Sequence, residues 1–368
     1  ILSESSRCAR YGFEYDPSIS ERRRIFMGSL IADDSWHAIA AHAAEAYGLY
    51  HTVSFIESNT TQTMSKRETR FDEGSLNYKM MQSGIFGPKT DVYVDFRVDL
   101  AKDYPELDTF RRENLQRSHI IQRWNEAGMQ PEDVGIICDV DEVFTRDFLL
   151  ALQSCDIPEF RPGQDCKESQ LTGQGLKFEM GPECATIGNF YTHPDVIIGE
   201  CIEGVGDADV HTPGCRKFEP YEGGHLIGKR LFYDDFPERT MFPLWTAWDI
   251  RRSPDKPVLE DGRLHTAFHF HNFFDSMSVL RNKYKTFAHP REDADVVPFS
   301  QIQRSAKVAV ACIKGEPGKQ TPYLGIEGRR PILFANEEYR SARMKEMKEE
   351  IEADEKRIAE LEQPVETD

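Results

Sequence analysis

The sequence predicts an α/β fold in which a mostly parallel, Rossmann-like sheet is flanked by helices. Two observations predict this class. Apolar segments of strand length alternate with segments of helix length over the first 150 residues, a pattern typical of βαβ units with right-handed crossovers. The fourth apolar segment then ends in a cluster of carboxylates, and the carboxyl ends of strands line the ligand crevice of an open α/β sheet.

The predicted elements follow from the spacing of apolar residues and from glycines that end helices. They are strands over 24–31, 51–57, 91–98 and 134–138, and helices over 34–47, 107–127, 145–153, 276–287 and 336–363. There is no Gly-x-Gly-x-x-Gly or Walker sequence, so a dinucleotide or P-loop site has no support.

The second half of the chain is less regular. Residues 154–263 contain short apolar pieces broken by Pro and Gly, with scattered aromatic residues. Such a region can form an acceptor pocket, in which aromatic faces stack on sugar rings, or an ordinary irregular core. We expect an N-terminal extension over 1–23 and a main domain over 24–330, with one half over 24–153 and a second half over 154–300.

The last segment, 331–368, is expected to be a highly charged helix and tail. Its apolar residues are spaced at 3, 4, 7 and 3 positions: Met344, Met347, Ile351, Ile358 and Leu361. This heptad-like pattern breaks at Asp354. It is compatible with a short coiled coil that forms a homodimer, or with a solvated tail helix.

Composition restricts the partners of the protein. The chain has 368 residues and a formal charge of −18. This charge disfavours nonspecific electrostatic binding to the phosphates of nucleic acids. No apolar run approaches the roughly 20 residues that span a bilayer. The chain begins without Met or a signal-peptide pattern, so we expect a trimmed sequence whose targeting segment, including any membrane anchor, is missing.

The cysteines indicate an oxidising compartment. Five of the eight lie between 155 and 215, and none forms a Cys-x-x-Cys pair. This clustering favours disulfides over thiolate metal binding. Cys138, inside an apolar segment, is expected to be a buried free thiol.

The most informative stretch is Val134-Gly-Ile-Ile-Cys-Asp-Val-Asp-Glu-Val143. It reads as a buried strand that delivers Asp139, Asp141 and Glu142 to the sheet edge. Hard oxygen ligands there suggest Mn²⁺ or Mg²⁺, which would hold a phosphate or diphosphate. The alternative is a strand-end aspartate that caps the helix over 145–153.

Four ordered segments together resemble glycosyltransferase family 17, whose members are β-1,4-mannosyl-glycoprotein 4-β-N-acetylglucosaminyltransferases. They are Val53-Ser-Phe-Ile-Glu-Ser-Asn-Thr-Thr61, Arg112-Glu-Asn-Leu-Gln-Arg117, Cys138-Asp-Val-Asp-Glu-Val143, and Phe268-His-Phe-His271 with Lys283 and His289 downstream. The family has Trp and Ser where this chain has Phe268 and His271. The resemblance implies a GT-A-type fold, UDP-N-acetylglucosamine as the donor, a glycan or glycoprotein acceptor, and a place in the Golgi or secretory lumen as the soluble part of a type II membrane protein. It also implies that 24–153 is the nucleotide-sugar half and 154–300 the acceptor half.

Candidate site residues follow from the chemistry of sugar transfer together with this resemblance. A divalent ion held by Asp141, with Asp139 shared or nearer the ribose, would stabilise the leaving diphosphate, and His269 is a third candidate ligand. The candidate substrate-binding residues are Glu57, Ser58, Asn59, Asp139, Arg117, Lys283, His289 and Trp248. The candidate general bases for an inverting transfer are Asp249, Glu179 and Glu200.

Each candidate has a structural alternative. Glu57, Ser58 and Asn59 are also suited to a turn, His269 to a place in the core, and Arg117 to an internal salt bridge with a sheet-edge carboxylate. Two other functions also remain open. One is a phosphatase of the haloacid-dehalogenase type with Asp139 as nucleophile, and the other is a non-catalytic carbohydrate-binding protein.

Overall fold

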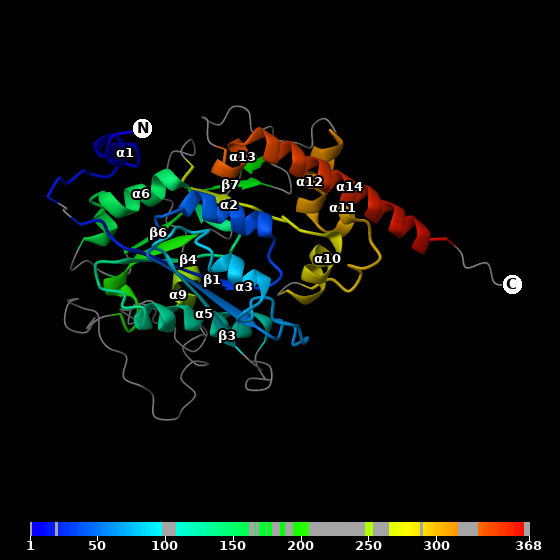
Figure 1. Ribbon diagram of the computed structural model, residues 1–368, viewed down its shortest axis with the longest axis horizontal. Helices are drawn as coiled ribbons and strands as arrows, with labels where there is room; N and C mark the ends of the chain where they lie inside the picture. The colour runs from blue at the N-terminus through cyan, green and yellow to red at the C-terminus, as the bar shows by residue number, and fades with distance from the viewer. Residues whose placement is uncertain are drawn as a thin grey trace, which may run out of the picture.

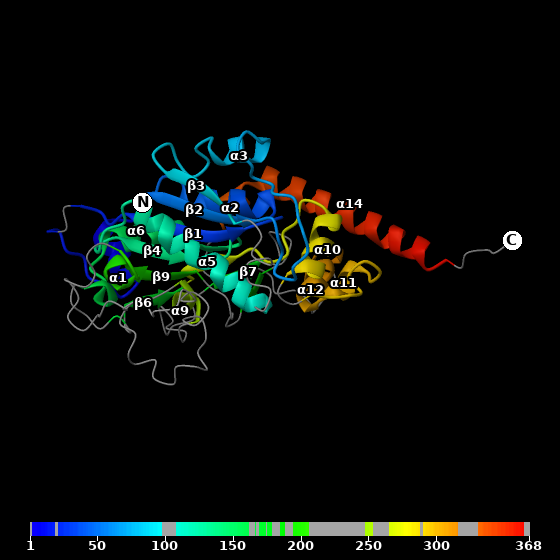
Figure 2. The same cartoon turned by 90° about the horizontal axis from the view of Figure 1, so that it is seen from below.

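The computed structural model describes residues 2–18, 21–97, 108–161, 166, 169–173, 175–178, 185–187, 194–205, 247–252, 265–287, 290–315 and 330–363. Its centre is a six-stranded sheet in the order β3-β2-β1-β4-β9-β6, which Figure 2 shows from top to bottom. The strands are β1 (Ile25–Ile31), β2 (Thr52–Ser58), β3 (Asp91–Arg97), β4 (Val134–Ile137), β6 (Gln170–Thr172) and β9 (Asp195–Ile198). The predicted α/β class is confirmed.

The four predicted strands form the parallel part of this sheet. β1 pairs in parallel with β2 and with β4, and β2 pairs in parallel with β3. The antiparallel strands β9 and β6 extend the sheet beyond β4, and neither was predicted. A second, four-stranded sheet has the order β5-β10-β7-β8, with β5 (Glu142–Phe144), β7 (Gly175–Phe178), β8 (Ala185–Ile187) and β10 (Ala267–His269).

Helices cover both faces of the central sheet (Figure 1). One face carries α2 (Trp36–Ala46) and α6 (Arg146–Ser154), and the other carries α5 (Thr109–Glu126) and α9 (Ala247–Arg252). A Cβ atom on Gly28 of β1 would lie 2.0 Å from Ile120 of α5. Glycine is therefore required where α5 crosses the sheet, because any side chain would push the helix away.

The remaining helices are α1 (Glu4–Arg10), α3 (Leu76–Met81), η1 (Pro158–Phe160), η3 (Gly199–Cys201), α10 (Met277–Thr286), α11 (Phe299–Ile302), α12 (Arg304–Lys314), α13 (Ile332–Ala335) and α14 (Glu337–Leu361). The predicted C-terminal charged helix is α14. Figures 1 and 2 place α1 and the end of α14 at opposite ends of the long axis. No helix among the described residues is long and apolar enough to cross a membrane.

The apolar stripe of α14 packs inside its own chain. Met347 and Ile351 are buried in a core cluster with residues of α10, α11 and α12, and Ile358 is also buried. Leu361, at the end of the stripe, is 59% exposed. Two of the residues that suggested a coiled coil, Met347 and Ile351, therefore already pack against α10 to α12, and a homodimer through this stripe stays a prediction.

Two disulfides connect described cysteines: Cys8–Cys155 and Cys166–Cys201. Cys312 is also disulfide-bonded, and Cys138 is a buried free thiol as predicted. Both sheets contain strands from before and after residue 153. The central sheet combines β1, β2, β3 and β4 with β9 and β6, and the second sheet combines β5 with β10, β7 and β8. The division of the main domain into a nucleotide-sugar half and an acceptor half stays a prediction.

Candidate active site

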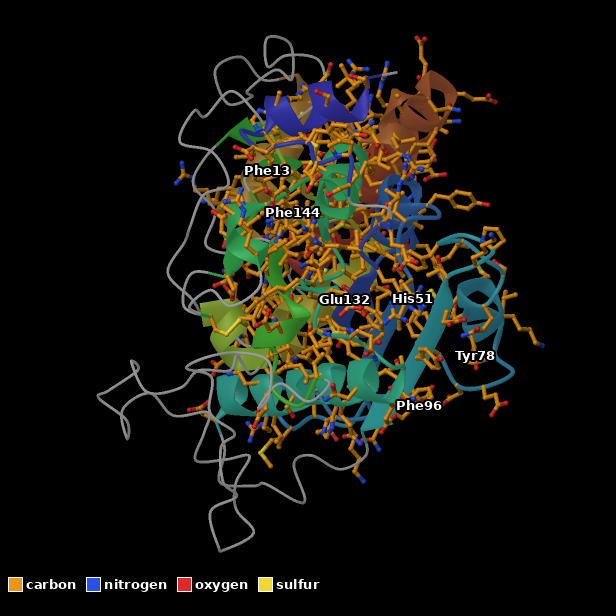
Figure 3. All side chains as sticks on the ribbon, turned by 90° about the vertical axis from the view of Figure 1, so that its left-hand side faces the viewer. Phe13, His51, Tyr78, Phe96, Glu132 and Phe144 are labelled. Carbon is orange, nitrogen blue, oxygen red and sulfur yellow. A yellow bond between two sulfur atoms is a disulfide. The ribbon has the colours of Figure 1, made fainter. Side chains whose placement is uncertain are left out.

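The candidate site is a cavity of about 500 Å³ at the carboxyl ends of β1, β2 and β4. Figure 3 views the opposite end of the sheet, where His51 and Glu132 precede β2 and β4. Parallel strands end at the same edge, so three stretches of polar side chains meet there. The polar residues that line the cavity include Asp33, Asp34, Ser58, Arg67, Arg117, Asp139, Asp141, Arg251, His269, His271 and Lys283.

Asp141 and His269 come together because β5 and β10 pair. Glu142 stands opposite His269 in the antiparallel register, and the Phe270 N–H donates to the Asp141 carbonyl at 2.7 Å. His269 Nε2 then lies 3.6 Å from Asp141 Oδ2. Burial alone would raise the pKa of Asp141, but the charges of His269 and Lys283 outweigh burial and hold that pKa well below its ordinary value. Asp141 is therefore an anion in the cavity.

Lys283 places its ammonium group in the same cavity from α10. Burial would lower the pKa of Lys283, but the carboxylates of Asp141, Asp34 and Asp139 raise it above its ordinary value. No carboxylate of the described residues lies within ion-pair distance of its Nζ. The side chain is therefore a cation that faces negative charge without being closed in a salt bridge.

Asp139 has different partners from Asp141. Its Oδ1 lies 2.7 Å from Arg117 Nη2 and its Oδ2 lies 3.5 Å from Arg251 Nη2. The two guanidinium groups keep the pKa of Asp139 below its ordinary value although burial opposes this. The sequence is compatible with Arg117 either as a substrate-binding residue or as the partner of a sheet-edge carboxylate in an internal salt bridge. The contact with Asp139 is such a salt bridge.

Glu142 lies behind the cavity and holds the loop that carries both aspartates. Its side chain is fully buried, and Oε2 accepts hydrogen bonds from the Asp139 N–H at 2.9 Å and from Arg251 Nη1 at 2.9 Å. A buried carboxylate needs such partners, because without them its desolvation is costly. Glu142 is thus an internal support and does not line the cavity.

The residues at the end of β2 mainly shape the following loop. Glu57 is fully buried and accepts hydrogen bonds from the Arg67 side chain and from the backbone N–H groups of Arg70 and Phe71, at 3.2, 2.7 and 3.0 Å. Ser58 lines the cavity and its Oγ accepts from the Thr60 N–H. Asn59 Oδ1 accepts from the Thr60 hydroxyl, in agreement with the turn interpretation.

One candidate base lies away from this cavity, and four other candidates fall outside the described side chains. Glu200 follows β9, which runs antiparallel to β4, so it lies beside Pro131 at the edge where β4 begins. This is the edge opposite Asp139 and Asp141. Asp249 and Trp248 belong to α9, but their side chains lie outside the described residues, as do Glu179 and His289.

Five of the polar cavity residues named above were not among the predicted site residues: Asp33, Asp34, Arg67, Arg251 and His271. Asp34 is the third residue after β1, and burial raises its pKa, so the strand-end argument applied to Asp139 would have found it. Arg67 and Arg251 lie in the loop after β2 and in α9. Nothing in their local sequence indicates that they reach the carboxylates of Glu57 and Glu142.

The part of the chain that forms most of this sheet edge is similar in sequence to a known protein family. Residues 2–161 match glycosyltransferase family 17, and they include Glu57, Arg117, Asp139 and Asp141. The match covers 160 of the 368 residues, which is less than half of the chain. The protein is a glycosyltransferase enzyme, and the phosphatase and non-catalytic alternatives give way to this assignment.

Comparisons of the glycosyltransferase with individual proteins add less. No curated protein matches the chain. Among solved structures, the apo form of mouse xyloside xylosyltransferase 1 is similar at 12% sequence identity with a TM-score of 0.26, over 68% of this chain and 98% of that chain.

Proposed function

We propose that this glycosyltransferase is metal-dependent and moves N-acetylglucosamine from UDP-N-acetylglucosamine to a hydroxyl of a glycan or glycoprotein, with inversion. The observation that supports it is the convergence of Asp141, His269 and Lys283 in one cavity, from a strand-end loop, β10 and α10. A carboxylate beside an imidazole suits a divalent cation, and a separate, partly exposed ammonium group suits a diphosphate.

The residues present fit Mn²⁺ or Mg²⁺. Among the described residues, no three His, Cys, Asp or Glu side chains are grouped closely enough to enclose a metal ion. Asp141 Oδ2 and His269 Nε2 are nevertheless 3.6 Å apart, a separation that two ligands of one ion can have when each bond is about 2.1 Å. Ions of this class commonly take one or two protein ligands and fill the remaining positions with water and substrate phosphates.

The roles proposed for the chain's residues follow from their contacts. Asp141 and His269 would hold the ion, which would stabilise the charge that develops on the leaving diphosphate. Lys283 would pair with a phosphate oxygen. Asp139, whose carboxylate is held by Arg117 and Arg251, would accept hydrogen bonds from the ribose, with Ser58 at the end of β2 as a further contact.

The acceptor side of the proposal rests on the sequence. Asp249 stays our first candidate for the base that removes the acceptor proton, with Glu179 as the second. The family match and the disulfides support a place in the lumen of the secretory pathway, which we propose to be the Golgi.

Calorimetry tests the metal and the donor together. We expect UDP-N-acetylglucosamine to bind in the presence of Mn²⁺ and to bind at least tenfold more weakly when EDTA removes the ion, because a group that bridges protein and diphosphate contributes more than about 1.4 kcal/mol. Asp141→Asn should remove the dependence on Mn²⁺. Asp91→Asn is a matched control, because Asp91 is an exposed aspartate at the start of β3.

The panel should include UDP-xylose and GDP-mannose, so that the preferred base and sugar are both read out. Mn²⁺-independent binding of every nucleotide sugar would overturn the metal proposal. Preference for another sugar would overturn only the choice of donor.

A further inference from the structure

The peptide between the two aspartates of the cavity is held from behind by a buried histidine. His42 Nδ1 lies 3.0 Å from the carbonyl oxygen of Val140, and His42 Nε2 lies 2.9 Å from the hydroxyl of Tyr50. His42 is on the inward face of α2 and is 1% exposed, whereas Tyr50 precedes β2 and is 3% exposed. Neither side chain lines the cavity.

The partners fix the direction of both hydrogen bonds. A carbonyl oxygen only accepts, so Nδ1 of His42 carries a proton and donates to Val140. Burial lowers the pKa of His42 to about 4, so the ring is neutral near pH 7 and its Nε2 must accept. The Tyr50 hydroxyl therefore donates to His42, and the chain of donation runs from Tyr50 through His42 to Val140.

The Val140 peptide connects the two functional carboxylates. Asp139 on one side is fixed by Arg117, and Asp141 on the other side is fixed through its own carbonyl, which accepts from the Phe270 N–H. Val140 itself is 2% exposed, so its carbonyl would lose a hydrogen-bond partner if the peptide rotated away from His42. Such a rotation would also change the directions in which Asp139 and Asp141 leave the backbone.

We propose that Tyr50 and His42 are positioning residues that fix the peptide between Asp139 and Asp141 and thereby set the affinity of the cavity for its divalent ion. The inference rests on the proposed function, because it assumes that Asp141 holds the ion. Groups that orient metal ligands without touching the metal commonly change metal affinity when they are replaced.

Two substitutions of His42 separate the hydrogen bond from the mere presence of a polar side chain. The amide nitrogen of His42→Asn takes the position of Nδ1 and can still donate to Val140. The longer side chain of His42→Gln places its nitrogen near the position of Nε2, from which Val140 is out of reach. Mn²⁺ would be titrated into each protein saturated with UDP, and electron paramagnetic resonance would report the free ion.

We expect His42→Gln to raise the Mn²⁺ dissociation constant about tenfold, the lower end of the range for groups that orient metal ligands. His42→Asn should restore most of the affinity. Tyr50→Phe removes the donor to Nε2 and should weaken Mn²⁺ binding about fivefold, which corresponds to one hydrogen bond of ordinary net strength.

Tyr11→Phe is the matched control for Tyr50→Phe. Tyr11 is 1% exposed and donates to Asp147 at 3.1 Å, a contact between α6 and the residue that follows α1. Both variants lose one buried hydroxyl and should show similar decreases in melting temperature. Only Tyr50→Phe should weaken Mn²⁺ binding.

The outcomes are distinguishable. A parent protein that binds no Mn²⁺ with UDP overturns the proposed function and this role with it. A parent that binds Mn²⁺, together with His42→Gln and Tyr50→Phe variants of unchanged affinity, overturns this inference alone. Equal loss in His42→Asn and His42→Gln also overturns it, because the donor to Val140 would then be irrelevant.

Discussion

Asp139 and Asp141 are two residues apart in the sequence, yet their surroundings give them different properties. Asp139 is an acceptor for Arg117 and Arg251, so its charge is balanced within the protein. Asp141 faces a histidine and, at longer range, Lys283, groups that a cation or an anion can engage. The role of a residue in a motif is therefore set by the side chains that approach it from distant elements, and not by its identity alone.

At the same scale, the buried His42 predicts how stability depends on pH. Burial lowers its pKa from 6.5 to about 4 in the folded protein, so the unfolded chain binds the proton more readily between these values. The contribution of the neutral His42 to the free energy of unfolding is fully present above pH 6.5. It is lost as the pH falls toward 4, and the total loss is about 3 kcal/mol. The His42→Asn protein has no such group and should lose that much less stability over the same range.

Urea unfolding of the parent and of His42→Asn at several pH values between 7 and 4 gives this difference directly. Protonation of carboxylates affects both proteins alike, so it cancels in the comparison. Parallel pH profiles for the two proteins would contradict the assigned environment of His42.

Among the elements, α14 holds α10, which carries Lys283 into the cavity. Arg281 of α10 and Asp354 of α14 form a buried ion pair, with Nε and Oδ1 3.1 Å apart, and Glu350 of α14 accepts from the Met277 N–H at the start of α10. Arg343 adds a hydrogen bond to the carbonyl of Phe274. The C-terminal helix lies outside the segment that matches family 17, yet it supports one wall of the site.

We expect Asp354→Ala to lower the free energy of unfolding by about 3–5 kcal/mol, because it leaves the Arg281 guanidinium buried without its carboxylate. Glu352→Ala is the control on the same helix. Its partner Lys348 is exposed and the two lie 3.9 Å apart, so the loss should be below about 0.5 kcal/mol. Equal losses in urea unfolding would show that the buried pair does not hold α10.

The elements also show which parts of the fold could be predicted. β1, α2, β2 and α5 each repeat an apolar pattern over enough residues to identify their type. β4 has only four residues, but it is an apolar run that ends in a cluster of carboxylates, and the strand-end argument then places Asp139 and Asp141 at one edge. β6 and β9 have only three and four residues, too few for a period to be visible. Their place beside β4 depends on pairing between distant segments.

The site was predictable to a similar degree. His269 and Lys283 were found through the family resemblance, since nothing local to them indicates a cavity. Glu57 and Glu142 were misplaced at the surface of the crevice because a carboxylate is normally exposed. Their burial depends on Arg67 and Arg251, which the chain supplies from elsewhere.

In the whole molecule, disulfide Cys8–Cys155 ties the N-terminal helix to the end of α6 across a sequence separation of 147. Replacing both cysteines with serine should lower the free energy of unfolding by about 2–5 kcal/mol, because the unfolded chain regains the freedom that the loop closure removed. The Cys166–Cys201 disulfide closes a separation of 35. Its removal should cost about 1 kcal/mol less.

Chemical unfolding monitored by circular dichroism measures both losses. A larger loss for the Cys166 and Cys201 double variant would contradict the loop-length argument. The activity toward the donor should persist in both variants under conditions where the protein remains folded, since neither disulfide contacts the cavity.

The pairing of β5 with β10 has a consequence for folding. Asp141 and His269 meet only after two segments separated by more than a hundred residues have joined, and loop closure over such lengths delays contacts in folding. A nascent chain that has released only β1 to β5 therefore carries both aspartates without the imidazole or Lys283. Under the proposed role of Asp141 and His269, capture of Mn²⁺ would then mark the completion of folding, and a folding intermediate would stay inactive until β10 has paired with β5.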